Sequence, residues 1–394
     1  MVSHAHSPAS NPMHAFALEH LEVFVFRAPA EPPVQTSFGT MRERPAVLLK
    51  VTDQDGAHGW GEIWCNFPVV GAEHRARMAA YYLRPLALGK TWSSPQQCQQ
   101  ALHDALAVLA IQCGEPGTIH QIIAGLDTAI WDLLARKAGQ PLWRFLSGQQ
   151  TEHANPVPVY ASGLNPTNPE QLAAQKLQEG YRAFKLKVGF GTERDLANLQ
   201  AMRAVIGTEL PLMVDANQAW TAAQATMAAQ TMAQFDLGWL EEPIRADRPV
   251  AEWQQLSQAQ PLQLAAGENL SAMPDFIAYL DSDAIGVMQP DLGKWGGISG
   301  CFEVAQHTLA RGKLFCPHWL GGGIGLMASM HLKAAVGGAG YVEVDANPNV
   351  LRELLAMPVF ALKDGAVTLN QAPGLGVEPD LVATRDFVVQ VTGI

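Results

Sequence analysis

The sequence predicts an α/β protein in which an α+β domain precedes a barrel of eight βα units. Three observations support this fold class. From about residue 155 onward, short apolar runs alternate with longer stretches of helical character. The polar residues that end these runs recur 23 to 28 positions apart, a spacing that fits one strand, one helix and two loops. Before residue 150, β-rich runs come first and helical runs follow, as expected for a separate α+β domain.

The α+β domain is predicted to begin with two β-rich runs, at 18–28 and 44–64, the second of which is divided by a polar turn. The Pro-rich stretch between them, 29–41, is predicted to be a loop that contributes to binding. Residues 118–140 have helical periodicity, and their apolar face consists of Ile122, Leu126, Ile130, Leu133 and Leu134.

The remainder of the chain contains eight strand-like runs. They lie near residues 158, 185, 213, 239, 265, 287, 315 and 342. Eight consecutive βα units close into a barrel, and the carboxyl ends of its strands meet at one mouth, where active sites form. Polar residues that end these runs are therefore expected to converge, although they are far apart in the sequence.

Composition and charge limit the possible partners. The 394 residues carry a net charge of −11 without a cluster of Lys and Arg, which argues against a nucleic-acid or anionic-membrane partner and favours a small molecule. Five cysteines at scattered spacings suggest a reduced cytoplasm. The polar stretch 1–12 lacks the features of a secretory signal and is predicted to be a loose terminus, and no window is apolar enough for a membrane span. We expect a soluble cytoplasmic protein.

Three acids end three consecutive predicted strands: Asp215, Glu241 and Glu268, with Glu242 and Asn217 beside them. Carboxylates on neighbouring strands repel one another unless a cation neutralises them. Ligation by oxygen alone favours a hard ion, Mg²⁺ before Mn²⁺ or Ca²⁺. The alternative is that these acids form salt bridges with lysines or arginines of the barrel.

Lys185 and Lys187 are two positions apart on a predicted strand, so their side chains share one face. If that face is the barrel interior, burial and the like-charged neighbour should push each amine toward its neutral form, which is a base. The alternative is a pair that faces solvent.

Asp291 ends the sixth predicted strand and His318 ends the seventh. A carboxylate on a neighbouring strand can bind one imidazole nitrogen and leave the other to exchange protons with a substrate. Glu343 on the eighth strand is predicted to donate a hydrogen bond or to orient a group, and Asp345 competes for that role.

Together these groups suit one type of chemistry. A metal held by three carboxylates can bind a substrate carboxylate and stabilise the enediolate that forms when the adjacent carbon loses its proton. Lys187 and His318, on opposite faces, then determine the product. If one group removes the proton and the other protonates a leaving β-hydroxyl, the product is a 2-keto acid. If the other returns a proton to the same carbon, the centre inverts.

The chain resembles the mandelate racemase subgroup of the enolase superfamily over nearly its whole length. The similar motifs are KLK at 185–187, VDAN at 214–217, LEEP at 240–243, GEN at 267–269, QPDLGKWGG at 289–297, PHW at 317–319 and VEVDANPN at 342–349, together with the segment 125–148. The resemblance implies an N-terminal α+β capping domain at 1–150, a modified (β/α)₇β TIM barrel at 151–355, and a C-terminal segment at 356–394 that returns to the cap.

The resemblance also implies roles for individual residues. Mg²⁺ would lie on Asp215, Glu241 and Glu268, and Lys187 would be one acid/base with the His318–Asp291 dyad as the other. Lys185 would contact the substrate carboxylate and tune its neighbouring lysine, while Lys294 would support the metal ligands from behind. Members of this family also lead us to expect a homo-oligomer.

Substrate choice in this family depends on two segments of the cap, which correspond here to 28–41 and 64–71. Gln35, Thr36 and Ser37 are predicted to bind hydroxyl groups, which favours a sugar acid, whereas Trp64, Phe67 and Trp319 are predicted to shape an apolar pocket. We expect dehydration of an aldonate or aldarate to a 2-keto-3-deoxy acid. The alternative is a racemase, epimerase or lactone cycloisomerase that acts on a hydroxy or sugar acid.

Two further interpretations stay open from the sequence. A metal-stabilised barrel could serve as a binding or scaffold protein. The glycine-rich stretch 321–325 suggests a phosphate-binding loop, although it lacks the Lys-Ser/Thr pair of a P-loop.

Overall fold

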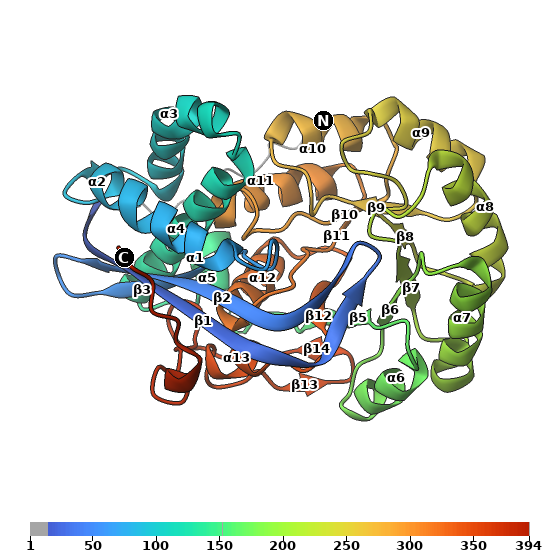
Figure 1. Ribbon diagram of the computed structural model, residues 1–394. Helices are drawn as coiled ribbons and strands as arrows, with labels where there is room; N and C mark the ends of the chain where they lie inside the picture. Colours follow the sequence, from blue (N-terminus) through green and yellow to red (C-terminus); the bar gives the residue numbers. More distant parts are fainter. Residues whose placement is uncertain (1–14, 152, 394) are drawn as a thin grey trace.

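The structure is a computed structural model that describes residues 15–151 and 153–393. The stretch 1–12, predicted as a loose terminus, lies outside these residues. Figure 1 shows two regions side by side, a cap built from the N-terminal part of the chain and a barrel built from the middle part. Within the described residues, no helix has the length and apolar character that crossing a membrane would require.

The cap consists of an antiparallel sheet covered by helices. The sheet has the order β3-β2-β1-β4 and consists of β1 (Phe16–Thr36), β2 (Gly39–Asp53), β3 (His58–Ile63) and β4 (Thr91–Trp92). Its helices are α1 (Gly71–Met78), the π-helical η1 (Ala79–Leu83), α2 (Arg84–Ala87), α3 (Pro95–Cys113), α4 (Pro116–Lys137) and α5 (Leu142–Ser147). Helix α4 is the predicted amphipathic helix, and its apolar residues are buried in the core between sheet and helices.

The prediction of a long loop at 29–41 is wrong. Strands β1 and β2 continue as a hairpin through this region, and only Ser37 and Phe38 form the turn. The register is shifted between Pro29 and Val34, so the hairpin accommodates its prolines at an irregularity instead of breaking off. In Figure 1 this hairpin extends from the cap and overhangs the barrel.

The barrel contains the eight predicted strands in sequence. They are β5 (Val157–Leu164), β6 (Phe184–Lys187), β7 (Leu212–Asp215), β8 (Leu240–Glu241), β9 (Leu264–Ala266), β10 (Val287–Met288), β11 (Leu314–Phe315) and β12 (Val342–Asp345). The helices between them are α6 (Pro169–Gln178), α7 (Thr192–Ile206), α8 (Ala222–Met232) with η2 (Ala233–Phe235), α9 (Val250–Ala259), α10 (Met273–Asp281), α11 (Gly297–Ala310) and α12 (Gly323–Val336).

Strands β5 to β11 pair in parallel with their sequence neighbours, and β12 pairs with β5. The ring closes between β11 and β12, where Phe315 N donates to Ala339 O and Glu343 N donates to Pro317 O, each at 3.4 Å. This is the (β/α)₇β arrangement. All eight strands point the same way, so their carboxyl ends form one mouth.

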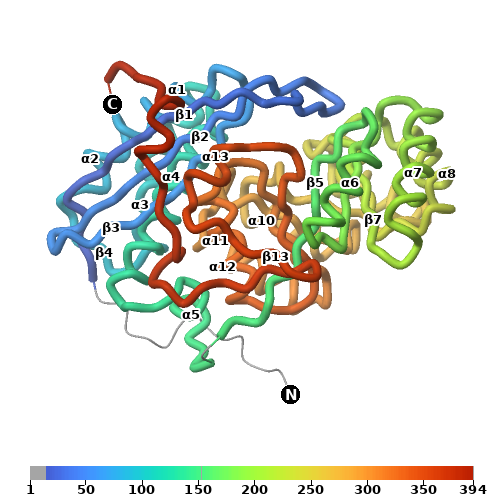
Figure 2. Tube along the Cα trace, turned by 90° about the horizontal axis from the view of Figure 1, so that it is seen from below, coloured from blue at the N-terminus to red at the C-terminus, as the bar shows by residue number. Residues whose placement is uncertain are grey.

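The C-terminal segment returns to the cap. It contains α13 (Val350–Leu354), a short hairpin of β13 (Leu362–Lys363) and β14 (Ala366–Val367) that pairs with β5, and η3 (Arg385–Phe387). Val388 then bridges Phe26 of β1, and Val389 N donates to Val25 O at 2.8 Å. Figure 2 shows this segment running across the cap.

Candidate active site

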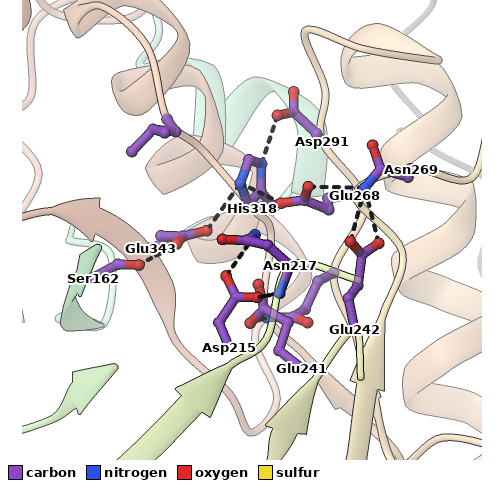
Figure 3. Close-up of polar contacts among 12 residues, drawn as sticks. Ser162, Asp215, Asn217, Glu241, Glu242, Glu268, Asn269, Asp291, His318 and Glu343 are labelled. Atoms are coloured by element: carbon purple, nitrogen blue, oxygen red, sulfur yellow. Dashed lines mark hydrogen bonds and ion pairs between the residues drawn. The ribbon is translucent and has the colours of Figure 1, made fainter. Parts of the chain in front are cut away.

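The predicted site residues meet at the carboxyl ends of the barrel strands. Figure 3 shows carboxylates from neighbouring strands gathered in one region, with an imidazole among them. The predicted residues are Lys185 and Lys187 of β6, Asp215 of β7, Glu241 of β8 and Glu343 of β12, with Glu268, Asp291 and His318 two or three residues after the ends of β9, β10 and β11. All are buried except Glu268, which is partly buried.

Lys187 and Asp215 form the first pair. They are register partners on β6 and β7, and Lys187 Nζ lies 2.6 Å from Asp215 Oδ2. Asn217 holds the same carboxylate, since its backbone N–H donates to Oδ1 at 2.7 Å and its amide donates to Oδ2 at 3.1 Å. Three contacts therefore fix the orientation of the Asp215 carboxylate.

Lys185 lies deeper than Lys187 and is fully buried. Its Nζ contacts both oxygens of Glu241 at 2.6 Å and Glu343 Oε1 at 2.9 Å. Ser162 of β5 donates its hydroxyl to the same oxygen of Glu343. The alternative of a solvent-facing lysine pair is excluded by this burial.

His318 stands between two carboxylates. Its Nδ1 lies 2.6 Å from Asp291 Oδ2 and its Nε2 lies 2.6 Å from Glu268 Oε2, with Glu343 Oε2 at 3.5 Å (Figure 3). Asp291 is itself held by the backbone N–H groups of Gly293 and Lys294, at 2.8 Å and 3.1 Å. The predicted dyad is therefore formed.

The residues predicted to support the metal ligands also gather here. Asn269 donates to both oxygens of Glu242, at 3.0 Å and 2.8 Å, and to Glu268 Oε1 at 2.9 Å. Lys294 Nζ lies 3.2 Å from Glu268 Oε1 and 4.7 Å from the centre of the Trp64 ring. This lysine links the barrel mouth to the cap.

Neighbouring carboxylates oppose the predicted shift of the two lysines toward the neutral form. Burial lowers the pKa of Lys185, but Glu241 and Glu343 outweigh it and raise that pKa well above its usual value. Burial likewise opposes the charge on Lys187, and Asp215 again reverses the effect and raises its pKa. Desolvation lowers the pKa of His318, while Glu268 and Glu343 raise it well above its usual value.

The pKa values of the carboxyl groups depend on their neighbours. Burial raises the pKa of Glu241 to about 7, although Lys185 opposes this, and the charges of Asp215 and Glu343 add to it. Burial and the charge of Glu268 raise the pKa of Glu242 well above its usual range. This buried region therefore contains more acidic groups than cationic ones. The resulting excess of negative charge favours a bound cation.

Both sequence interpretations of the three acids find support in this geometry. Asp215, Glu241 and Glu268 each contact a lysine, as the salt-bridge alternative expects. Within the described residues, no group of three or more His, Cys, Asp or Glu is arranged around a common point. The donor set nevertheless fits Mg²⁺, because it offers only oxygens, and the buried Asn217 Oδ1 has no hydrogen-bond partner among the described residues.

The residues predicted to bind substrate hydroxyls lie at the hairpin tip. Thr36 donates its hydroxyl to Gly39 O at 3.0 Å within the turn, and Gln35 N donates to Asn165 Oδ1 at 2.9 Å. Ser37 donates to Asn217 O at 2.9 Å, which ties the tip to the residue that holds Asp215. Their contact with a substrate stays a prediction.

The two tryptophans differ in their surroundings. The indole N–H of Trp64 is buried without a hydrogen-bond partner among the described residues. Trp319 is only 2% exposed, and its indole N–H donates to Gly322 O at 2.8 Å. Trp319 therefore has a packing role in addition to the substrate contact predicted for it.

Sequence reasoning missed several site residues. Gln289 Nε2 donates to Glu241 Oε2 at 2.6 Å, Ser162 donates to Glu343, and Asn269 bridges two acids. Gln289 is two positions before Asp291, and Ser162 is near the end of the first barrel strand. The strand period and the rule for polar strand ends would have indicated both.

Solved structures of other proteins have the same fold. A crystal structure of a mandelate racemase/muconate lactonizing enzyme from Bordetella bronchiseptica RB50 is 50% identical and superposes with a TM-score of 0.88, over 95% of this chain and 99% of that one. A racemase from Streptomyces coelicolor A3(2), crystallised with bound magnesium, is 28% identical with a TM-score of 0.85, over 94% of this chain and 100% of the other.

Curated relatives include isomerases and dehydratases. D-galactarolactone cycloisomerase of Agrobacterium fabrum is 28% identical over 90% of this chain and 94% of its own length. L-talarate/galactarate dehydratase of Salmonella typhimurium is 31% identical over 67% of this chain and 64% of its own length. Relatives with the same general architecture therefore catalyse different reactions.

Two family models match the chain. The N-terminal domain of mandelate racemase / muconate lactonizing enzyme matches residues 20–147, and the enolase C-terminal domain-like model matches residues 169–383. These matches cover the cap and the barrel that carries the acids, the lysines and the dyad. The chain therefore belongs to the mandelate racemase/muconate lactonizing enzyme group of the enolase superfamily.

Proposed function

We propose that the protein is a Mg²⁺-dependent enzyme that removes the α-proton of a carboxylate substrate, and that its reaction is the dehydration of an acid sugar to a 2-keto-3-deoxy acid. One observation carries the proposal. Lys187 of β6 lies 2.6 Å from Asp215, and His318, which follows β11, lies 2.6 Å from Glu268, so each contacts one of the three acids predicted to hold the metal. Two proton-transfer groups thus flank one anionic centre.

Asp215, Glu241 and Glu268 would hold the metal, with Asn217, Glu242 and Lys294 supporting them. Bound Mg²⁺ supplies Lewis-acid stabilisation of the negative charge that develops on the substrate carboxylate. The oxygen-only donor set, the surplus of buried acids and the magnesium bound by a relative support this choice of ion.

The residues of the chain would then move two protons. One of the pair Lys187 and His318, in its neutral form, takes the α-proton, which leaves an enediolate. A cation on the neighbouring carboxylates would offset their charge and lower the pKa of this group. The other gives a proton to the β-hydroxyl, which departs as water when its carbon–oxygen bond breaks. The resulting enol tautomerises to the 2-keto acid. Asp291 holds His318 Nδ1, which leaves Nε2 facing the carboxylates and the substrate.

Lys185 and Glu343 would act at the substrate carboxylate. Lys185 is within 2.9 Å of Glu343 and presents a buried positive charge at the base of the mouth. Charge pairing of this kind fixes a substrate carboxylate with its α-carbon between the two proton-transfer groups. Gln35, Thr36 and Ser37 at the hairpin tip, with Trp64 and Trp319, would contact the rest of the sugar acid.

A second candidate is a lactone cycloisomerase, racemase or epimerase. The match to D-galactarolactone cycloisomerase over 94% of that protein favours it. The same two groups would serve. In a racemase or epimerase the second proton returns to the α-carbon, whereas in a lactone cycloisomerase the bond between the β-carbon and the ring oxygen breaks and that oxygen stays in the product as a carboxylate, so no water leaves in either case. The two candidates therefore use the same residues and differ in whether the reaction releases water.

A panel of aldonates, aldarates and their lactones tests the proposal. The protein with Mg²⁺ should convert at least one acid sugar to a 2-keto acid, detected as its semicarbazone. ¹H NMR in D₂O follows α-proton exchange in the same samples. Exchange or inversion without 2-keto acid, or 2-keto acid formed from a lactone alone, would replace dehydration by isomerisation, and silence in both measurements would remove the proposal. Light scattering on the eluting protein tests the homo-oligomer.

A further inference from the structure

Glu62 connects the cap to the glycine-rich stretch 321–325 of the barrel. It is on β3 and is 2% exposed. Its carboxylate accepts from Gly322 N at 2.5 Å and from Gly325 N at 2.9 Å, at the start of α12. A Cβ on Gly322 would lie 2.6 Å from this carboxylate, so the glycine permits the contact. These N–H groups are already bound to an internal carboxyl group, which argues against the phosphate-loop interpretation.

Asp127 makes the equivalent contact at the preceding barrel helix. It is on α4 of the cap and is 2% exposed. Its carboxylate accepts from Ser299 N at 2.9 Å and from Ser299 Oγ at 2.6 Å, in the first turn of α11. Trp131 donates its indole N–H to the same hydroxyl at 2.8 Å. A helix N-terminus offers free N–H groups and a positive dipole end to a carboxylate, while burial raises the pKa of both Glu62 and Asp127 to about 7.

The two carboxylates belong to one rigid unit of the cap. Strand β3 lies directly against α4, and a Cβ on Gly61 would be 2.0 Å from Gly125 O. Such an approach between backbones leaves no space for sliding. The separation of Glu62 from Asp127 is therefore fixed, and with it the separation of the helix starts that they bind.

The same two helix starts follow the two halves of the dyad. Helix α11 begins six residues after Asp291, and α12 begins five residues after His318. Trp319 packs between the two segments that link Asp291 to α11 and His318 to α12. A Cβ on Gly293 would lie 2.6 Å from the Trp319 ring and a Cβ on Gly325 would lie 2.0 Å from it, so the indole is wedged between them.

We propose that Glu62 and Asp127 are positioning residues, through which the cap holds Asp291 and His318 at hydrogen-bonding distance. Neither carboxylate touches the site. Each acts through the backbone of the helix start that follows one member of the dyad. The cap thereby sets the geometry of one proton-transfer group, in addition to covering the mouth. The catalytic consequence rests on the proposed function, whereas the geometric consequence does not.

The test compares Glu62→Ala and Glu62→Gln with Asp53→Ala. Asp53 is a matched control because it is also a buried cap carboxylate, 3% exposed, and accepts from two backbone N–H groups, those of Asp55 and Ala57, each at 3.0 Å. It is the last residue of β2, and its remaining side-chain contact, with Lys137, also lies within the cap. Both alanine variants should lose stability, so thermal denaturation alone does not distinguish them.

The first readout needs no substrate. Diethyl pyrocarbonate should modify His318 faster in Glu62→Ala than in the wild-type protein, and amide hydrogen exchange should accelerate in peptides that cover 317–326. Asp53→Ala should leave both rates at the wild-type values, and Glu62→Gln should fall between because it keeps one acceptor oxygen. Equal effects in Glu62→Ala and Asp53→Ala would overturn the proposal.

The second readout uses a converted substrate. Glu62→Ala should lower the proton exchange that depends on His318 by about 10- to 100-fold, the usual cost of losing hydrogen bonds to a buried charged group. The exchange that depends on Lys187, and Mg²⁺ affinity measured by calorimetry, should stay unchanged. A uniform fall in all three would mean general damage and would contradict a positioning role. If no substrate is found, the first readout still decides the geometric claim.

Discussion

Arg44 of the cap hairpin and Asp345 at the end of β12 form a buried ion pair, with Arg44 Nη2 at 2.5 Å from Asp345 Oδ2 and both residues only 2–3% exposed. The pair joins the overhanging hairpin to the barrel strand that carries Glu343. Asp345 is further held by the backbone and amide N–H groups of Asn347, at 3.0 Å and 2.9 Å. Asp345 therefore stabilises the contact between cap and barrel. Of the two acids predicted for a role at the site, Glu343 is the one that faces it.

Arg44→Met should destabilise the protein by about 3–5 kcal/mol, because removal of one partner leaves the other charge buried and unpaired. Urea unfolding followed by circular dichroism measures the change. Arg42→Met, two positions away on the same strand and exposed, is the control and should change stability by less than about 0.5 kcal/mol. The double variant Arg44→Met/Asp345→Leu should recover part of the loss. A change for Arg44→Met no larger than the control would contradict the role of the pair.

Lys187→Ala and His318→Asn should each reduce turnover by about 100- to 10,000-fold, the usual contribution of a positioned acid or base. Each variant should keep α-proton exchange for the substrate epimer whose proton faces the remaining group. ¹H NMR in D₂O with both epimers measures this. Lys363→Ala, an exposed lysine of β13, is the control. Wild-type exchange in both site variants would refute the scheme with two proton-transfer groups.

Excess EDTA should abolish turnover, and added Mg²⁺ should restore it. Glu241→Gln should weaken Mg²⁺ binding in calorimetry, because it removes one of three negative ligands, whereas the exposed Glu209→Gln should bind Mg²⁺ as the wild-type protein does. Full activity in excess EDTA would remove the metal from the reaction.

Gln289→Leu should lower Mg²⁺ affinity by about 10- to 100-fold, the usual effect of losing a group that orients a metal ligand. The side chain holds Glu241 Oε2 at 2.6 Å, so its loss frees that carboxylate to rotate. Gln258→Leu, on the exposed face of α9, provides the control. Calorimetric titration of metal-free protein gives the affinities, and equal values for the two variants would show that Gln289 does not orient Glu241.

His331 should make stability depend on pH. Its Nδ1 accepts from Trp143 N and its Nε2 donates to Leu375 O, each at 3.1 Å, so the buried ring is neutral. Burial lowers its pKa from 6.5 to about 4. Protonation therefore favours the unfolded chain, and the stabilisation present above pH 6.5 falls by about 3 kcal/mol as the pH approaches 4.

His331→Gln keeps a donor and an acceptor but does not titrate. As the pH falls from 7 to 4, the unfolding free energy of the wild-type protein should decrease relative to that of this variant. Urea unfolding at several pH values measures it. A constant difference across this range would mean that His331 is not neutral in the folded protein.

The barrel and most of the site could be predicted from the sequence. The regular spacing of polar strand ends located the eight strands, and the same rule selected the three acids, the lysine pair and the dyad, because residues that end parallel strands share one mouth. The hairpin could not be predicted in this way. Its prolines suggested a loop, whereas a register shift between Pro29 and Val34 lets the strands continue.

The sequence by itself determined the architecture, the residue types at the mouth and the face of β6 that carries both lysines, because these depend on local periodicity. Only the tertiary structure decided which charges pair. Lys185 lies between Glu241 and Glu343, and this proximity raises its pKa although burial alone would lower it. The contacts of Glu62 and Asp127 with barrel helices were likewise settled by the fold. Interactions across more than 150 positions depend on distances in space, which no local pattern in the sequence encodes.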